Sequence, residues 1–182
     1  MRMLLHSGTV IDTSDVTPEN ITLRDIAWGL SRQVRFGGAS DEEYTVAQHS
    51  VLMYRHALEK RYSMANLQRY LCHDFAEAYT TDIPTPWKAR WPGAQRDEDN
   101  ILRDVEDRFG MPRGLLWELP GVVKADDTMC MRYEASHLFP NTPAEVWGEG
   151  PVDFTPMSPW KVWNKDRAMA ELLLACSEAG IR

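Results

Sequence analysis

Apolar residues recur every three or four positions along most of the chain, which is the spacing of amphipathic helices. We expect helices over residues 22–36, 44–60, 64–82, 94–109, 121–139 and 164–180. Signals at the helix ends support several boundaries: Thr45 and Gln48 have the spacing of a capping box, and Pro84 follows the third helix. The last helix is expected to start at Asn164 or Asp166.

Two stretches depart from the helical pattern. Residues 4–11 ("LLHSGTVI") mix short β-prone pieces with turn residues, which indicates a small N-terminal hairpin. Residues 140–163 are rich in Pro, Trp and Gly and show no regular period, as in a lid, an interface arm or a disordered segment. Since no repeat or linker divides the chain, we expect residues 1–182 to form one all-α domain, a helical bundle that includes the hairpin.

Composition and charge limit the partners. The 182 residues are 43% hydrophobic and 26% charged, an ordinary globular composition, and the net charge of −7 argues against binding to a nucleic-acid polymer or an anionic membrane. Cys72, Cys130 and Cys176 are odd in number and lack CxxC spacing, which is typical of a reducing compartment. No apolar stretch is long enough for a signal peptide or a membrane span. We therefore expect a cytoplasmic protein.

Charged residues interrupt the apolar pattern of residues 64–82. His73 and Asp74 are adjacent, Glu77 follows three residues later, and Asp82 lies near the end. Charged side chains are rarely buried unless they are paired or bind a metal. Positions three and four apart share a face of a helix, so we expect the first three side chains to face one cleft. Imidazole and carboxylate together suit a borderline divalent ion.

Further ligands must come from other helices. His49 lies one turn into its capped helix, and Asp126 or Asp127 lies on the helix over 121–139. Two His and two Asp would leave coordination positions open for water and substrate, as hydrolytic metal sites require. Structural zinc prefers closed, thiolate-rich sites, which argues against a purely structural metal protein.

Three motifs carry a resemblance to a known family. They are "DIAWGLSRQVRFGGASDEEYTVAQHSVL" (25–52), "CHDFAEAYTTDIPTPWK" (72–88) and "VVKADD" (122–127). Together they resemble the HD-domain phosphohydrolases, in particular the small branch with 5′-deoxynucleotidases, prophage-encoded relatives and phage dATP triphosphohydrolases. The likeness covers about residues 1–140 and implies an HD-type bundle.

The resemblance implies a role for each matching residue. The metal ligands that it implies are His49, His73, Asp74 and Asp127, the last because Val123, Lys124 and Asp127 fit the pattern V-K-x-x-D. Glu134, seven residues later, supports this register over Asp126. Glu77 matches the carboxylate that orients or deprotonates the attacking water, and Asp82 matches a carboxylate that protonates the leaving oxygen. The implied substrate contacts are Arg35 and Lys88 at the phosphate, Phe36 at the sugar and Gly38 near the base.

The implied activity is metal-dependent hydrolysis of 2′-deoxynucleotides at the α-phosphate. The cofactor would be a divalent ion (Zn, Co, Mn or Mg) and the partner a small deoxynucleotide. The phage resemblance favours deoxyadenosine nucleotides, with either a dATP triphosphohydrolase or a 5′-deoxynucleotidase as the enzyme. It also implies a homo-oligomer, dimer or hexamer, that acts in a bacterial cytoplasm and could be encoded by a phage or prophage. The alternatives are a cyclic-nucleotide phosphodiesterase and a non-catalytic nucleotide sensor.

Overall fold

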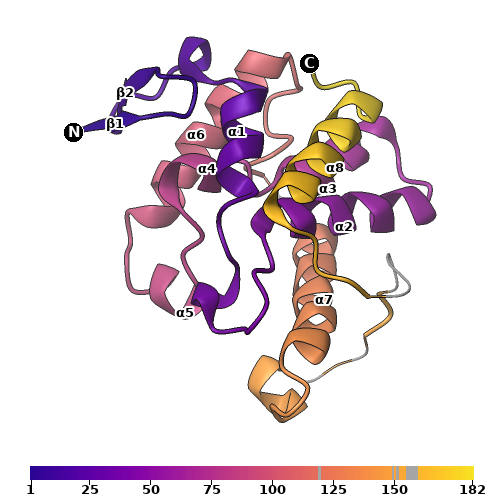
Figure 1. Ribbon diagram of the computed structural model, residues 1–182. Coiled ribbons are helices and arrows are strands. Elements are labelled where there is room, and N and C mark those ends of the chain that lie inside the picture. The colour runs from indigo at the N-terminus through magenta and orange to yellow at the C-terminus, as the bar shows by residue number, and fades with distance from the viewer. Residues whose placement is uncertain (119, 149, 151, 155–159) are drawn as a thin grey trace.

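The chain folds as an all-α bundle with a small N-terminal hairpin, as the sequence predicts (Figure 1). The computed structural model describes residues 1–118, 120–148, 150, 152–154 and 160–182. The helices are α1 (Leu23–Leu30), α2 (Val46–Glu59), α3 (Met64–Cys72), α4 (Glu77–Thr80), α5 (Thr85–Lys88), α6 (Ala94–Phe109), α7 (Gly121–Leu138) and α8 (Lys165–Glu178). Short 3-10 turns are η1 (Pro18–Asn20), η2 (Phe36–Gly38) and η3 (Ala144–Trp147). Strands β1 (Arg2–Leu4) and β2 (Val10–Asp12) pair antiparallel, with Met3 opposite Ile11.

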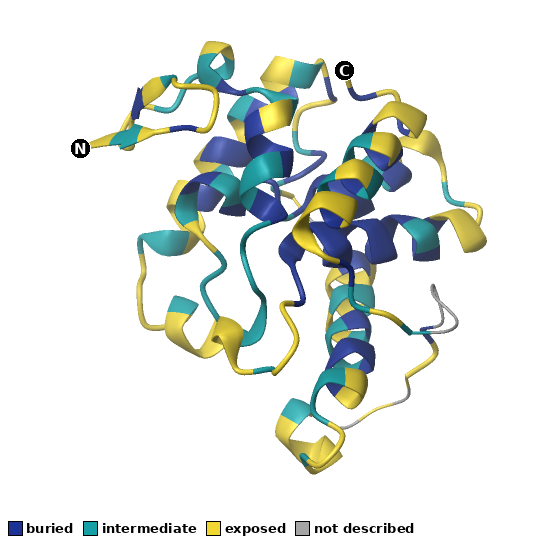
Figure 2. Cartoon of the chain, viewed as in Figure 1, coloured by how far each residue is buried: buried dark blue, intermediate teal, exposed yellow. Residues whose placement is uncertain are grey.

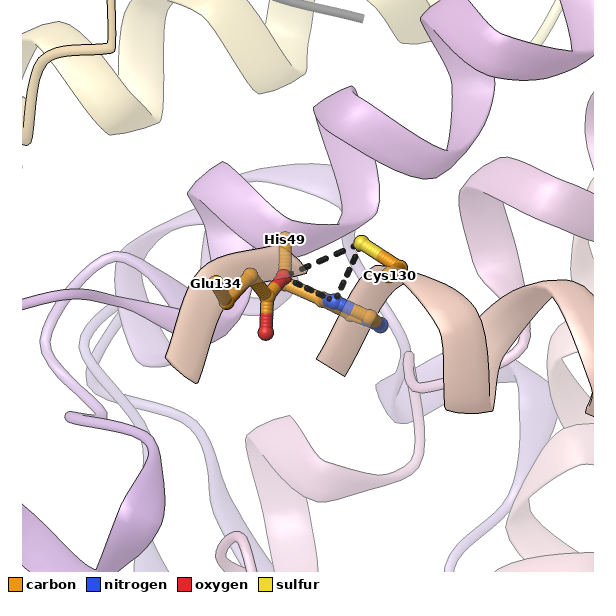
Figure 3. A group of neighbouring side chains, drawn as sticks. All are labelled: His49, Cys130 and Glu134. Carbon is orange, nitrogen blue, oxygen red and sulfur yellow. Dashed lines mark hydrogen bonds and ion pairs between the residues drawn. The ribbon is translucent and has the colours of Figure 1, made fainter. Parts of the chain in front are cut away.

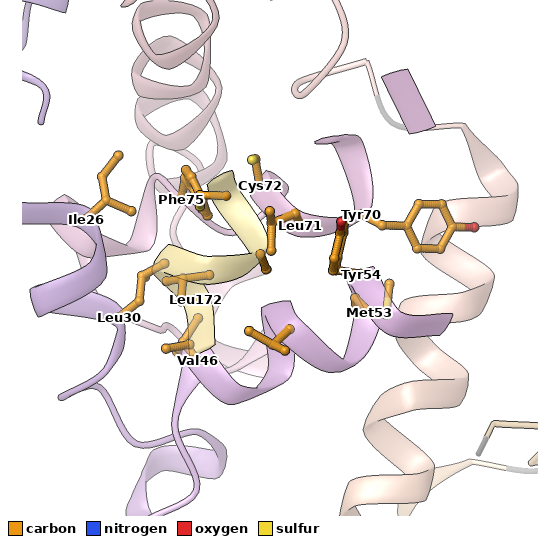
Figure 4. Packing of buried hydrophobic residues seen from close by; sticks show 14 of the residues in the cluster. Ile26, Leu30, Val46, Met53, Tyr54, Tyr70, Leu71, Cys72, Phe75 and Leu172 are labelled. Carbon is orange, nitrogen blue, oxygen red and sulfur yellow. The ribbon is translucent and has the colours of Figure 1, made fainter. Parts of the chain in front are cut away.

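Helix α2 runs through the middle of the bundle, where it packs against α3, α7 and α8. Every residue from Val46 to Tyr54 is buried (Figure 2). The apolar residues around it include Ile26, Leu30, Leu71, Phe75 and Leu172 (Figure 4). A helix buried on all sides carries its polar residues into the interior as well, and these must then find partners there.

The helix ends largely confirm the sequence signals. Thr45 caps α2 by accepting a hydrogen bond from the Gln48 backbone N–H at 3.3 Å. The Gln48 side chain does not return to Thr45; it donates to the Lys161 carbonyl at 2.8 Å and accepts from the Trp163 N–H at 2.8 Å. The C-terminal arm is therefore tied to α2 by the residue expected to complete the capping box. Of the two candidate starts for α8, Asn164 is the N-cap.

The helix expected over residues 22–36 is wrong in its second half. Helix α1 ends at Leu30, and the following segment pairs with the residues before α2. Arg35 donates to the Tyr44 carbonyl at 2.8 Å, and Val46 donates to the Gln33 carbonyl at 3.0 Å. These antiparallel bonds replace the helical ones and fix the backbone on both sides of Arg35.

The single helix expected over residues 64–82 is also wrong. It breaks into α3 and α4, with residues 73–76 between them in a turn. Phe75 N–H bonds to Cys72 at 2.9 Å and Glu77 N–H to Asp74 at 3.0 Å, the tighter i to i−3 pattern. His73, Asp74 and Glu77 therefore do not lie on one continuous helix, although Asp74 and Glu77 remain close enough for the charge of one to affect the pKa of the other.

Close contact between α1 and α4 fixes the position of the shorter helix. A Cβ built on Gly29 would lie 3.2 Å from the backbone and side chain of Ala78, so only glycine allows this approach without a shift. Helix α4 begins with Glu77 and is followed by Thr81, whose φ is +80°.

The arm over residues 140–163 is partly regular. It contains η3, and Phe154 is buried with its ring stacked on His56 at 4.6 Å between centroids. Residues 149, 151 and 155–159 of this segment lie outside the described residues. Within the described part of the chain, none of the helices has the length and apolar character needed to cross a membrane.

Candidate metal centre

The four side chains predicted as metal ligands lie together at the centre of the bundle. His49 comes from α2, His73 and Asp74 from the turn after α3, and Asp127 from α7. The His49 Nε2 atom lies 3.4 Å from His73 Nε2, 3.4 Å from an Asp74 oxygen and 3.2 Å from an Asp127 oxygen. The His73 Nε2 atom lies 3.4 Å from Asp74 and 3.9 Å from Asp127.

These separations fit one divalent ion. Ligand atoms about 2.0–2.1 Å from an ion lie roughly 3.0 Å apart at right angles and roughly 3.4 Å apart in a tetrahedron. Donor atoms of His49, His73 and Asp74 all lie within 4.8 Å of one another. The Asp127 side chain is 40% exposed, whereas His49 is fully buried, so the cluster is open to solvent on the side of α7.

Hydrogen bonds turn both imidazoles toward this point. His49 Nδ1 lies 2.7 Å from a Glu134 oxygen, and His73 Nδ1 lies 3.1 Å from the Tyr70 carbonyl. Both acceptors require a proton on Nδ1, which assigns the lone pair of each ring to Nε2. Partners of this kind on the far ring nitrogen are usual for metal-ligating histidines. The residues therefore fit a metal ion.

The two neighbouring aspartates make different contacts. Asp126 accepts a hydrogen bond from the Tyr70 hydroxyl at 2.6 Å and lies 3.5 Å from His56 Nε2. It is occupied away from the cluster, whereas Asp127 lies beside both candidate histidines.

Glu134 contacts Nδ1 of His49, the ring nitrogen that faces away from the other candidate ligands, and it was not assigned a role from the sequence. It is fully buried, and one of its oxygens accepts from the Tyr44 hydroxyl at 2.7 Å. The same oxygen accepts from His49 and from the Cys130 thiol, the latter at 3.2 Å (Figure 3). Its other oxygen lies 3.3 Å from Arg35 Nε. Burial raises the pKa of Glu134. Arg35 and His49 lower it by more than burial raises it, so the pKa lies below its ordinary value.

Glu134 keeps its charge beside a neutral thiol. Burial raises the pKa of Cys130, and the nearby carboxylate raises it again, which favours the neutral thiol that donates to Glu134. The spacing offers a signal for Glu134: it lies seven residues after Asp127, two turns along the same face of α7.

Arg35 lies between the centre and this support. Its guanidinium is 3.6 Å from Asp74 and 3.3 Å from Glu134, and its side chain is only 12% exposed. The neighbouring carboxylates raise its pKa well above the ordinary value despite burial, which acts in the opposite direction. A buried guanidinium next to a group of candidate metal ligands suits an anionic ligand with several oxygens.

Two further carboxylates lie beside the cluster. Burial raises the pKa of Glu77 well above its ordinary value, and the charges of Asp74 and Asp82 raise it further. Burial also raises the pKa of Asp82, more than the nearby Arg35 lowers it. One Glu77 oxygen lies 4.0 Å from Lys88 Nζ and the other is buried without a hydrogen-bond partner.

Lys88 has a second partner that the sequence did not suggest. Its ammonium lies 2.8 Å from Glu98 on α6, close enough for a hydrogen bond. This contact keeps the cation of the short helix α5 near Glu77.

Gln33 was also missed by sequence reasoning. Its side-chain amide donates to the Glu77 carbonyl at 2.7 Å and accepts from the Asp82 N–H at 2.9 Å. One residue thus holds the start and the end of the segment that bears both carboxylates. No sequence pattern pointed to it, because its contacts lie more than 40 positions away.

The turn after Arg35 is left-handed. Phe36, Gly37 and Gly38 have φ values of +58°, +62° and +72°, and only the first is not glycine. The Phe36 ring packs edge-on against Phe139 and Trp147, with centroids 5.4 and 5.7 Å away. A Cβ on Gly38 would meet nothing within 4 Å.

A cavity of about 710 Å³ lies elsewhere, between the hairpin, α4 and α6. Its lining contains none of the candidate ligands, and we do not assign it to the centre.

Comparison with known proteins places the chain among relatives of undetermined function. No family model matches it. It is 35% identical over 155 residues to "Uncharacterized protein RCAP_rcc00048" of Rhodobacter capsulatus, an alignment covering 80% of this chain and 76% of that protein. It is also 35% identical over 106 residues to "Uncharacterized protein YfdR" of Escherichia coli, covering 58% of this chain and 57% of that protein. The chain therefore belongs to the same protein family as the Rhodobacter capsulatus protein.

Proposed function

We propose that this protein is a metal-dependent phosphohydrolase of the HD-domain type that cleaves 2′-deoxynucleotides at the α-phosphate. The observation that carries the proposal is the convergence of two imidazoles and two carboxylates from three parts of the chain, with the Nε2 atoms 3.4 Å from each other and 3.2–3.9 Å from the carboxylate oxygens. Open coordination positions and adjacent cations are what phosphate ester hydrolysis requires.

The metal would be held by His49, His73, Asp74 and Asp127. When bound, a divalent ion supplies Lewis-acid stabilisation of charge and a water of lowered pKa. Arg35 and Lys88 bind and orient the phosphate, because both are cations beside the cluster. Each is already paired with a carboxylate, which holds its side chain in place before substrate arrives.

Two carboxylates would move protons. Glu77 is proposed to accept a proton from the attacking water, the role that the resemblance implies, and burial makes its ionised form a stronger base than an exposed carboxylate. Asp82 is proposed to donate a proton to the nucleoside 5′-oxygen as it leaves, a role favoured by its own raised pKa. Gln33 would position both groups through its two hydrogen bonds.

The resemblance supports deoxyadenosine nucleotides as substrates. A triphosphate would yield deoxyadenosine and triphosphate, and a monophosphate would yield deoxyadenosine and phosphate. Phe36 is proposed to lie against the sugar, as in the family that the sequence resembles.

Product analysis tests the proposal. The protein is incubated with Mn²⁺, Co²⁺, Mg²⁺ or Zn²⁺ and a panel of dATP, dAMP, dGTP, ATP and cyclic AMP, and the products are separated by ion-exchange chromatography. We expect deoxyadenosine with triphosphate or phosphate, and no product from Asp127→Asn. Asp126→Asn is the matched control and should keep its activity, because Asp126 bonds to Tyr70. Absence of product from every deoxynucleotide would refute the proposal, and turnover of cyclic AMP alone would replace it with a phosphodiesterase.

A further inference from the structure

An exposed pair of tryptophans stands beside the candidate centre. Trp87 on α5 and Trp91 just after it are 54% and 51% exposed, although indoles are usually among the more buried side chains. Their rings are stacked, with centroids 6.0 Å apart and planes 29° from parallel. Two large apolar rings held in order at the surface indicate a binding surface rather than packing.

The pair borders a hollow of about 340 Å³. Its lining consists of Thr81, Asp82, Ile83, Pro84, Trp87 and Trp91. This volume falls within the usual range for small-molecule pockets, roughly 300–1,000 Å³. Apart from one hydroxyl and one carboxylate, its side chains are apolar. They suit a flat, apolar group and offer little for hydrogen-bonded readout.

Two contacts join this hollow to the candidate centre. Asp82, part of its wall, is the carboxylate proposed to protonate the leaving 5′-oxygen. Pro84, on the same wall, approaches the turn that follows Arg35, since a Cβ built on Gly37 would lie 3.8 Å from Pro84 Cγ. The hollow therefore begins at the carboxylate that we propose acts on the leaving 5′-oxygen.

Helix α5 contributes residues both to the candidate centre and to the hollow. Its last residue, Lys88, turns toward Glu77 and Glu98, whereas the preceding Trp87 lines the hollow. A phosphate-facing cation and an aromatic face thus come from neighbouring residues on one four-residue helix.

We propose that the hollow beside Asp82 is the base subsite, in which Trp87 and Trp91 stack against the nucleobase. The inference rests on the proposed function and adds how the base is bound. Stacking is tolerant of sequence because every base has an aromatic face, and larger rings gain more contact. The subsite therefore favours purines over pyrimidines while contributing little to the choice between adenine and guanine.

Calorimetric titration tests the subsite directly. Binding of dAMP and of base-free 2-deoxyribose 5-phosphate is measured with Mn²⁺ in a Glu77→Gln background, which limits turnover. We expect dAMP to bind about tenfold or more tightly than the base-free ligand. The ratio should fall close to one in Trp87→Ala/Trp91→Ala and persist in Trp87→Phe/Trp91→Phe, which keeps the aromatic faces. Trp117→Ala is the control, because Trp117 packs on Arg103 outside the hollow.

Three results would overturn the subsite: equal affinity of the wild-type pair for both ligands, a ratio unchanged by the double alanine variant, or no binding of either ligand. A fourth result would also overturn it: sedimentation shows that the double alanine variant no longer self-associates, while its affinity for dAMP is unchanged. The surface formed by Trp87 and Trp91 would then be a contact between two copies of the chain. Binding with the expected ratio in a protein that hydrolyses no deoxynucleotide would sustain the subsite and refute the proposed activity, so the two failures are distinguishable.

Discussion

Replacement of Glu134 by glutamine should separate the support of the metal centre from its ligands. Glu134 is fully buried. Tyr44, His49 and Cys130 donate to one of its oxygens, and Arg35 forms an ion pair with the other. Glutamine has the same shape, but its amide nitrogen is itself a donor. In either orientation of the amide, that nitrogen faces a group that also donates, and the charge opposite Arg35 is lost.

The magnitude follows from these contacts. Breaking one partner of a buried ion pair costs about 3–5 kcal/mol, and leaving a buried hydrogen-bonding group unsatisfied costs about 1–3 kcal/mol. Since the amide keeps one acceptor, we expect a loss of about 3 kcal/mol in the free energy of unfolding. The substitution also removes the carboxylate that orients the His49 ring, and loss of such a partner typically lowers metal affinity by about 10–100-fold.

Urea unfolding of the chelated protein measures the first quantity, and calorimetric titration with Mn²⁺ measures the second. Glu106→Gln is the matched control, because Glu106 is a buried glutamate that accepts from Gly114 N–H at 3.0 Å and Leu116 N–H at 2.6 Å, away from the centre. It should lose stability but keep its metal affinity. If Glu134→Gln binds Mn²⁺ as tightly as the wild type, Glu134 does not position a ligand and the reasoning fails.

Three further changes test separate parts of the structure. Asp127→Asn should lower Mn²⁺ affinity by more than about 100-fold in a calorimetric titration while Asp126→Asn changes it less than about threefold, and equal effects would contradict the assignment. Gln33→Ala should cost about 1–3 kcal/mol in urea unfolding and lower kcat more than it raises KM, whereas an unchanged kcat would deny it a positioning role. Burial raises the pKa of Asp25, but bonds from Thr22 and the Ser7 N–H bring it below its ordinary 3.8, so its ionised form stabilises the fold at neutral pH and that contribution is lost as pH falls below 3.8. Asp25→Asn should therefore be less stable than the wild type at pH 7 in urea unfolding, with a smaller difference near pH 3, and a pH-independent difference would contradict this.

The helices that the sequence predicted best are those whose ends are encoded locally. Gly110, with φ of +64°, ends α6 where expected, and Asn164 caps α8 through the Arg167 N–H. The helices expected over residues 22–36 and 64–82 were wrong, and for the first of them the reason is a contact far away in the sequence. The segment after Leu30 is extended because residues 44–46 accept and donate its backbone bonds, a partner that no local window contains.

The same distinction separates the ligands from their supports. Ligand chemistry restricts residue type, so His49, His73, Asp74 and one of the two neighbouring aspartates could be proposed from the residues, and the family resemblance selected Asp127. The structure brings these four side chains together. Glu134 and the other supports are chosen by contact between elements. The spacing of Glu134 relates it to Asp127, but its role as the hydrogen-bond partner of His49 is visible only in the structure, where α2 places the imidazole 2.7 Å away.

Charge balance explains how one core holds so many acidic groups. Six carboxylates gather at the centre and around it, against two cations, Arg35 and Lys88; the carboxylates are Asp74, Glu77, Asp82, Glu98, Asp127 and Glu134. Such an excess of negative charge is costly to bury, and the raised pKa values of Glu77, Asp82 and Glu98 express that cost. A divalent cation held between Asp74 and Asp127, where both imidazoles present Nε2, would offset part of this negative charge. In the proposed mechanism, Glu77 and Asp82 would then lie beside the ion rather than on it, so that the proposed proton carriers are separate from the metal ligands.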